Sequence, residues 1–312
     1  MVEHIWMREV YCESLIELAK NDDRVVLLEA DLMRASGTMP FRAEFPERTF
    51  DIGIAEANMI CIAAGLAAEG FIPFADTFTP FATRRCFDQL AISVAYSKLP
   101  VKICGTDPGI AAELNGGTHM SFEDVGIVRN LPGFTIIEPV DSTQLRQAMP
   151  FIAAHDGPVY MRLLRKPAEK IYDESYRFQW GKADVLREGS DVAIVGSGLM
   201  VYESLEAAEL LKNDGISATV VNVHTIKPLD DETLLKVAYN TGAVVAAENH
   251  SIINGLGSAV AELFSERFPI PIERVGVRDR FGEVGCTDYL KTALGLNRDV
   301  IAEAARKAIA RK

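Results

Sequence analysis

Residues 50–75 read FDIGIAEANMICIAAGLAAEGFIPFA. Two short β-rich runs, Phe50–Ile54 and Ile72–Ala75, flank an alanine-rich stretch, Ala55–Ala68, that has helical character and is closed by Gly70. A strand, a crossover helix and a second strand make up the unit from which parallel sheets are built. This alternation continues along the whole chain, so the sequence predicts an α/β fold.

The alternation divides into two doubly wound domains, each a mostly parallel sheet flanked by helices. Further strands are expected at Val25–Glu29, Val101–Gly105 and Val159–Leu164, with a helix near Arg85–Tyr96. The pattern restarts at Val192–Val195 and includes a strand at Ile272–Val277. Between the two halves, Lys166–Gly189 is charged and has no sustained period, which predicts a linker. We therefore expect the first domain at residues 1–178 and the second at residues 190–312.

Composition excludes several classes of protein. The chain of 312 residues is 48% hydrophobic and 24% charged, which is ordinary for a globular protein, and its net charge of −12 argues against a nucleic-acid partner. The most apolar stretch, Met59–Ala68, is far shorter than the ~20 residues that span a bilayer. Glu3 and Glu9 fall where a secretory signal would be apolar, so we expect no such signal. We expect a cytoplasmic protein with no membrane partner.

Polar and aromatic residues at strand-to-helix turns are the first candidates for a site, because ligands of open parallel sheets bind at the carboxyl ends of the strands. Glu56 follows such a strand and begins an apolar helix, where an acid also has the simpler role of complementing the helix dipole. Phe78 and Phe81 lie three residues apart, a spacing that is also typical of a core.

Two further groups of residues have the chemistry of a site. His119 ends the glycine turn Asn115–His119, where it is an acid–base candidate or a structural histidine. Arg8, Arg162 and Arg165 bind a phosphate or pair with the surplus acids. The residues alone leave both alternatives open.

Taken together, these residues resemble the pyrimidine-binding domain of transketolases. The resemblance lies in the order and spacing of Asp51–Met59, the Phe78 and Phe81 pair, and Gly117-Thr118-His119 followed by Glu123-Asp124. It continues through the second half and covers essentially the whole chain.

The resemblance implies thiamine diphosphate as the cofactor. By this resemblance, Glu56 is the carboxyl group at the pyrimidine ring nitrogen, and Phe78 and Phe81 stack on and enclose the ring. His119 matches the histidine that lines the reaction centre and handles protons of the donor sugar, and Asp31 matches an aspartate near the cofactor.

The resemblance also implies a phosphorylated sugar. Arg8 and Arg165 fall where transketolases place arginines for the sugar phosphate, and Ser36 lies within one residue of a serine that assists them. Asn115 takes the place of an aspartate that contacts the C2 hydroxyl, and Thr106 replaces a histidine at the phosphate or acceptor. The identity of the sugars stays open.

One expected segment is missing from the sequence. Enzymes of this class hold the diphosphate through Mg²⁺ or Ca²⁺ bound by Gly-Asp-Gly and by an asparagine about 25–30 residues later. The nearest string here, Asn213-Asp214-Gly215, is predicted as a helix end, so we expect no metal ligands in this chain. The cation and diphosphate would be held mainly by an N-terminal partner chain, in an α2β2 assembly built on a homodimer of this chain.

We therefore interpret the chain as the C-terminal subunit of a split transketolase that transfers a two-carbon ketol unit from a ketose phosphate to an aldose. Three alternatives remain. They are the β-type subunit of a 2-oxo acid dehydrogenase, an enzyme resembling 1-deoxyxylulose 5-phosphate synthase, and a non-catalytic dimerising subunit.

Overall fold

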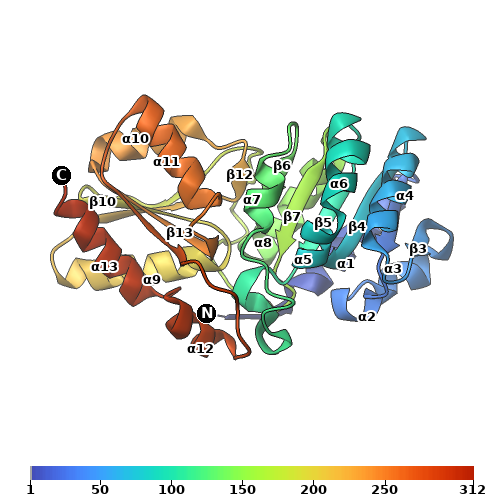
Figure 1. The fold of residues 1–312 in the computed structure, drawn as a ribbon, viewed down its shortest axis with the longest axis horizontal. Helices are drawn as coiled ribbons and strands as arrows, with labels where there is room; N and C mark the ends of the chain where they lie inside the picture. Colours follow the sequence, from blue (N-terminus) through green and yellow to red (C-terminus); the bar gives the residue numbers. More distant parts are fainter. Residues whose placement is uncertain (1) are drawn as a thin grey trace. The chain divides into compact units, whose positions relative to one another are not determined.

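The computed structural model describes residues 2–312, which form two compact units. One unit contains the chain up to Pro108 together with Ile127–Trp180, and the other contains Gly109–Gly126 and Gly181–Lys312. Each unit is a mostly parallel sheet flanked by helices, which confirms the predicted fold class (Figure 1). The domain ranges 1–178 and 190–312 stay a prediction.

The first unit is built on short buried strands. Its strands are β1 (Val2–Trp6), β2 (Val25–Glu29), β3 (Thr49–Asp51), β4 (Ile72–Phe78), β5 (Lys102–Thr106), β6 (Thr135–Ile137), β7 (Val159–Leu163) and β8 (Pro167–Glu169). Its helices are α1 (Met7–Asn21), α2 (Met33–Ser36), α3 (Met39–Glu44), α4 (Glu56–Ala68), α5 (Thr79–Ala82), α6 (Phe87–Gln89) and α8 (Ser142–Ala154), and α7 (Asp124–Arg129) contains the passage between the units.

The order of the main strands in the first unit is β6-β7-β5-β4-β2-β3, with every neighbouring pair parallel. β2, β5 and β7 are buried at every position, as expected of strands covered on both faces. Leu15 of α1, Leu27 of β2 and Met149 of α8 belong to one hydrophobic cluster, which places these helices on the same side of the sheet.

The second unit repeats this plan. Its strands are β9 (Asp184–Arg187), β10 (Val192–Gly196), β11 (Ala218–Asn222), β12 (Thr225–Lys227), β13 (Val244–Ser251) and β14 (Ile272–Val277). Its helices are α9 (Leu199–Asn213), α10 (Asp231–Thr241), α11 (Leu256–Arg267), α12 (Thr287–Leu294) and α13 (Arg298–Ile309). The sheet order is β14-β13-β10-β11-β9, and only the β9–β11 pairing among these is antiparallel in the described chain.

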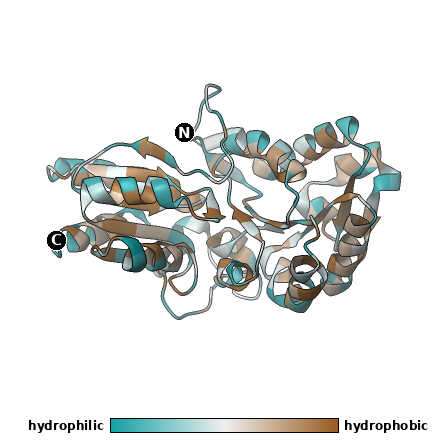
Figure 2. Ribbon diagram, turned by 90° about the horizontal axis from the view of Figure 1, so that it is seen from above, coloured by the Kyte–Doolittle hydropathy of each residue, from teal (hydrophilic) through white to brown (hydrophobic). Residues whose placement is uncertain are grey.

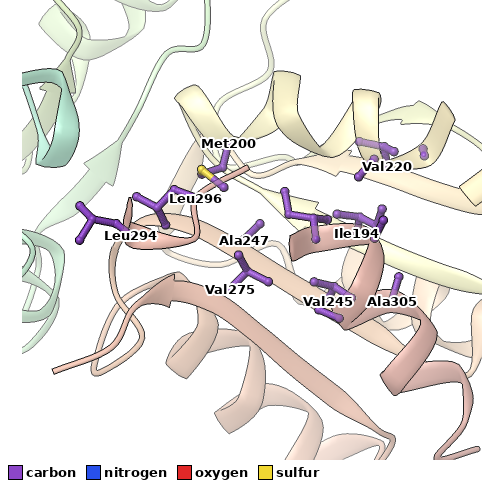
Figure 3. Packing of buried hydrophobic residues seen from close by; sticks show 14 of the residues in the cluster. Ile194, Met200, Val220, Val245, Ala247, Val275, Leu294, Leu296 and Ala305 are labelled. Atoms are coloured by element: carbon purple, nitrogen blue, oxygen red, sulfur yellow. The ribbon is translucent and has the colours of Figure 1, made fainter. Parts of the chain in front are cut away.

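Figure 3 shows how the core of the second unit packs, with Ile194 and Val245 of the sheet near Ala305 of α13, and Met200 of α9 beside Leu296. Hydrophobic residues lie along the strands of the unit, and hydrophilic residues gather on the outer helix faces (Figure 2). The segment 109–126 contributes Ile110, Met120 and Phe122 to this core, and burial of these side chains explains why it belongs to the second unit.

Two sequence-based expectations for local structure differ from the structure. Within the predicted linker Lys166–Gly189, β8 pairs antiparallel with β1, and β9 pairs antiparallel with β11. The stretch Arg85–Tyr96, expected as one helix, is instead a 3-10 turn, the short α6 and a π-helical segment, Leu90–Tyr96.

None of the helices in residues 2–312 combines the length and the apolar character that crossing a membrane requires.

Candidate active site

Most of the candidate residues in the first unit lie at one edge of its sheet. Parallel strands end at the same edge, and the segments that follow β2, β3, β5 and β7 carry Ser36, Glu56, Asp107 and Arg165, while Phe78 ends β4. This edge is where open α/β sheets bind ligands. The contacts of these side chains show which of them the fold brings together.

Glu56 is the first residue of α4, and its side chain is only 2% exposed. Its carboxylate Oε1 accepts a hydrogen bond from Nη1 of Arg85 at 2.7 Å. The unpaired N–H groups of the first helical turn favour negative charge at this position. Glu56 is thus a buried carboxylate with one charged partner, 29 residues further along the chain.

Arg85 joins Glu56 to the aromatic pair. The Arg85 guanidinium carbon lies 3.7 Å from the centre of the Phe81 ring, and the Phe81 and Phe78 rings are 6.1 Å apart at a tilt of 48°. Arginine faces on aromatic rings are stabilised by cation–π attraction. Sequence reasoning missed Arg85, because Arg84 and Arg85 together had no pattern that distinguished them from surface residues.

Phe78 is linked in turn to Arg165. The Arg165 guanidinium carbon lies 4.7 Å from the centre of the Phe78 ring. Asp107, which follows β5, binds the same guanidinium through Oδ2, to which Nε donates at 2.7 Å and Nη2 also donates. Asp107 Oδ1 accepts the backbone N–H of Arg165 at 3.1 Å. Asp107 therefore holds both the side chain and the backbone of Arg165.

Arg8 and Arg165 meet at one peptide group. Nη1 of each donates a hydrogen bond to the Ala35 carbonyl oxygen, at 3.1 Å in both cases. The Arg8 stem crosses Gly37, where a Cβ would come within 3.1 Å of Arg8 Cγ and where φ is +80°. Only glycine allows this close approach without strain. The two arginines that the resemblance assigned to the sugar phosphate are thus brought together, whereas Arg162 forms a buried ion pair with Glu138.

Ser36 lies beside this peptide group, but its hydroxyl points into the protein. The side chain is buried, and its Oγ donates to Glu29 Oε2 at 3.5 Å, a long hydrogen bond. Thr38 Oγ1 donates to the other oxygen of the same carboxyl group. Glu29 therefore ties down the segment that presents the Ala35 carbonyl.

Glu29 has a second buried acid for a neighbour. Burial, and then the charge of Asp76, raise the pKa of Glu29 well above its usual range, and burial raises the pKa of Asp76 to about 7. Tyr11 Oη donates to Asp76 Oδ1 at 3.1 Å. Two acids without a charged partner in such surroundings favour their neutral forms. Sequence reasoning did not identify this pair.

Asp31 lies outside the set formed by the aromatic rings and arginines. It is exposed, has a left-handed backbone with φ of 59°, and donates its N–H to Asp51 Oδ1 at 3.0 Å. Asp51 Oδ1 also accepts the N–H of Gly53 at 3.1 Å. Asp51 thereby connects the loop after β2 with the loop that leads to Glu56.

His119 and Asn115 belong to the second unit. Asn115 is exposed, and His119 is half-buried, with Nδ1 2.8 Å from the hydroxyl of Thr118. The turn between them packs tightly, because a Cβ on Gly117 would lie 2.4 Å from the carbonyl oxygen of Gly282. The predicted glycine turn is therefore a fixed structure.

Residues 2–312 contain no group of three or more His, Cys, Asp and Glu side chains arranged to hold a metal ion. Asn213-Asp214-Gly215 ends α9, with Asp214 as the C-cap and Gly215 at φ of 76°. This confirms that the string is a helix end.

Known proteins resemble the chain along its length. The family model for the transketolase pyrimidine binding domain matches residues 3–169, and that for the transketolase C-terminal domain matches residues 181–301. A solved chain described as "Split gene transketolase, inactive beta4 tetramer" superposes with a TM-score of 0.91 at 43% identity, covering 99% of this chain and 100% of that chain.

Two curated relatives extend the comparison. The 6-deoxy-6-sulfo-D-fructose transketolase subunit SqwH of Clostridium sp. (strain MSTE9) is 58% identical over 311 residues, which cover 100% of this chain and 97% of the relative. A 1-deoxy-D-xylulose-5-phosphate synthase of Geobacter sulfurreducens is 37% identical over 307 residues, which cover 97% of this chain and 48% of the relative. The resemblance found in the sequence is confirmed, and the chain belongs to the transketolase family.

Proposed function

We propose that this chain is the C-terminal subunit of a two-chain, thiamine diphosphate-dependent transketolase that moves a two-carbon ketol unit from a ketose to an aldose. The observation that carries the proposal is the contact of buried Glu56 with Arg85, and of Arg85 with the Phe81 ring. The relative at 58% identity, named as a transketolase subunit, supports it.

The residues fit the pyrimidine end of the cofactor. A flat, hydrogen-bonding cation already stacks on Phe81 and reaches Glu56 Oε1 at 2.7 Å, so the two surfaces suit a flat ring that carries nitrogen donors. Phe81 and Phe78 would enclose that ring and exclude water, and Glu56 would hold a proton at its carboxylate beside the ring nitrogen. When bound, thiamine diphosphate supplies the electron sink for breaking and forming the carbon–carbon bond.

Arg8 and Arg165 would hold an anionic group at the far end of the sugar. Their guanidinium groups meet at the Ala35 carbonyl oxygen, and charge-assisted hydrogen bonds to an anion are the strongest that these groups make. The resemblance in the sequence favoured a phosphate as this anionic group. The relative SqwH is named for a sulfonated sugar, so a sulfonate is a second candidate for the group. His119 and Asn115 keep the proposed roles of proton handling and contact with a sugar hydroxyl. Ser36 would assist the arginines indirectly, because its bond to Glu29 helps to fix the segment that presents the Ala35 carbonyl oxygen.

The partner would be an N-terminal chain that binds the diphosphate and Mg²⁺ or Ca²⁺. Ile54, Ile92 and Tyr96 of the first unit expose 75%, 58% and 82% of their surface, which suits a chain that associates with others. The related split-gene chain is described as an inactive tetramer of β chains, which supports self-association without activity in the absence of a partner. An α2β2 enzyme is the assembly we propose.

A second candidate reaction is favoured by one comparison. The relative named as a 1-deoxy-D-xylulose-5-phosphate synthase matches 97% of this chain, so condensation of pyruvate with an aldose phosphate is the rival chemistry. Pyruvate as the donor separates the two reactions.

The test is reconstitution of this chain with an N-terminal transketolase chain, thiamine diphosphate and Mg²⁺. We expect ketol transfer from a sulfonated or phosphorylated ketose to an aldose, and none from pyruvate. Turnover of pyruvate alone, or activity that Glu56→Gln leaves at the wild-type level, contradicts the proposal.

A further inference from the structure

We propose that Asp107 makes the anion site of Arg8 and Arg165 selective for a singly charged sulfonate over a phosphate. This inference rests on the function proposed above and names the residue that would set the class of donor. Asp107 acts through Arg165 and is a positioning residue, since its carboxylate contacts the guanidinium.

The geometry fixes the carboxylate in place. Asp107 is 3% exposed and Arg165 13% exposed, and Asp107 Oδ2 accepts hydrogen bonds from both Nε and Nη2 of Arg165. Asp107 has a left-handed backbone, with φ of 51°, and donates its own N–H to Leu163 at 2.9 Å. The carboxylate is therefore bound from two sides and is not free to move away when an anion arrives.

Asp107 also reduces what Arg165 can offer. A guanidinium group has five N–H donors in a fixed fork. Two of them contact Asp107, and one contacts the Ala35 carbonyl oxygen. Within the described residues, this leaves one N–H on Nη1 and one on Nη2 for a ligand. Three of the five donors of Arg165 are thus in use, whereas the hydrogen bond from Arg8 to the Ala35 carbonyl oxygen uses one donor of the Arg8 guanidinium group.

The charges decide which anion fits better. Two guanidinium groups and one carboxylate leave the site with a single net positive charge. A sulfonate carries one negative charge at neutral pH, whereas a phosphate monoester carries about 1.5 to 2. The second phosphate charge finds no further cation in this set and is repelled by Asp107 in a site where burial weakens screening. A sulfonate has three oxygen acceptors and no second charge.

The orientation of Arg165 supports the same conclusion. The guanidinium is held by Asp107, by Ala35 and against the Phe78 ring at 4.7 Å, so it cannot turn to give a phosphate more donors. The backbone carbonyl oxygen of Arg165 accepts a hydrogen bond from the backbone N–H of Arg8 at 3.2 Å. This bond fixes the backbones of the two arginines relative to each other. The set is a rigid site of fixed charge.

The experiment compares two donors that differ in their terminal group, 6-deoxy-6-sulfo-D-fructose and fructose 6-phosphate, with the reconstituted two-chain enzyme. We expect the wild-type kcat/KM to favour the sulfonate by about tenfold or more. Asp107→Asn keeps the shape and one acceptor for Arg165, and removes the charge. We expect it to shift the ratio of the two kcat/KM values toward the phosphate by about tenfold, mainly through KM.

Two variants control for structural effects. Asp107→Ser removes the same charge if Asp107→Asn fails to fold, and Glu138→Gln removes the carboxylate of the buried Glu138–Arg162 ion pair, 2.8 Å long, in the same unit. We expect Glu138→Gln to change stability and leave the donor ratio unchanged. A change in the ratio for Glu138→Gln equal to that for Asp107→Asn contradicts the role of Asp107.

The remaining outcomes separate the two proposals. Ketol transfer in which the wild type prefers the phosphate, or in which neither charge-removing variant moves the ratio, overturns the inference and leaves the proposed function intact. If a correctly assembled enzyme transfers from neither donor, the proposed function fails, and the inference fails with it.

Discussion

The Glu56–Arg85 ion pair and the Arg165–Asp107 pair are the two contacts on which the site depends at the scale of single residues. Each pairs a buried or nearly buried carboxylate with a guanidinium that also lies over an aromatic ring. Each aromatic ring is one that the sequence assigned to the cofactor. The two parts of the proposed site are thus connected through Phe78 and Phe81.

Glu56→Gln is expected to leave the fold unchanged and to lower kcat by about 100-fold or more, because an amide keeps the shape but supplies no carboxyl proton. Steady-state kinetics of the reconstituted enzyme give the measurement, with circular dichroism as the control for folding. Turnover within a few-fold of wild type would remove Glu56 from the chemistry.

Arg85→Ala is expected to lower the free energy of unfolding by about 1–2 kcal/mol, since it leaves the buried Glu56 carboxylate without its charged partner. Arg84→Ala removes the same charge one residue earlier and is the matched control. Urea denaturation of the two variants supplies the comparison. Equal losses would show that the effect belongs to the net charge of the segment and not to the ion pair.

Sequence reasoning named candidate residues for this site but did not name their partners. Glu56, Phe78, Phe81, Arg8 and Arg165 were found because their order and spacing resemble a family, and their roles stay predictions. Arg85 pairs across 29 residues and Asp107 across 58, so only the folded chain shows these contacts. The partner of Thr106 is likewise visible only in the folded chain. Its buried hydroxyl donates a hydrogen bond to the Thr77 carbonyl oxygen of the neighbouring strand at 3.3 Å.

At the scale of elements, strands with a continuous apolar run were predicted best. Val25–Glu29 and Ile272–Val277 have in the structure the bounds expected from the sequence. β1, β8 and β9 were missed, because they are three to five residues long, contain charged residues, and pair with strands far away in sequence. Such strands depend on tertiary pairing more than on local propensity.

In the stretch before β5, regular structure was predicted where the structure is irregular. Its composition predicts a single helix, but Leu90–Tyr96 adopts a π-helix after two short segments. π-Helical turns arise from packing and are frequent near functional sites. Here Arg85 lies in the 3-10 segment Arg84–Cys86, and the π-helical segment begins at Leu90. The irregular stretch therefore includes the residue that contacts Glu56.

β2 and β4 carry the buried acids Glu29 and Asp76, which make the stability of the first unit depend on pH. Burial raises the pKa of Asp76 from 3.8 to about 7, so the folded chain binds a proton that the unfolded chain has released between these values. The contribution of the protonated Asp76 to the free energy of unfolding is therefore fully present below about pH 4. It is lost as the pH rises through 7. Glu29 shifts in the same direction.

Asp76→Asn is expected to reduce this dependence, because the amide still accepts the hydrogen bond from Tyr11 and carries no charge. The stability difference between pH 5 and pH 8.5 should shrink by a few kcal/mol at most, with Glu29 supplying the remaining slope. Denaturation midpoints at the two pH values give the measurement. An unchanged difference would contradict the assignment of Asp76.

In the whole enzyme that we propose, this chain supplies the pyrimidine half of the site and another chain supplies the diphosphate half. Mg²⁺ or Ca²⁺ takes about six oxygen ligands, and the diphosphate group of the cofactor supplies only some of them. The described residues offer a carboxylate, aromatic rings and arginines at the sheet edge of the first unit, which suit the ring and the sugar.

The most direct test is calorimetric titration of thiamine diphosphate with Mg²⁺ into this chain alone and into its complex with an N-terminal transketolase chain. We expect no micromolar binding by the chain alone. We expect saturable binding by the complex, weakened by about 1–3 kcal/mol in Phe81→Ala through loss of the stacking surface. Micromolar or tighter binding by this chain alone would contradict the division of the site between two chains, because it would mean that the chain contains its own diphosphate site.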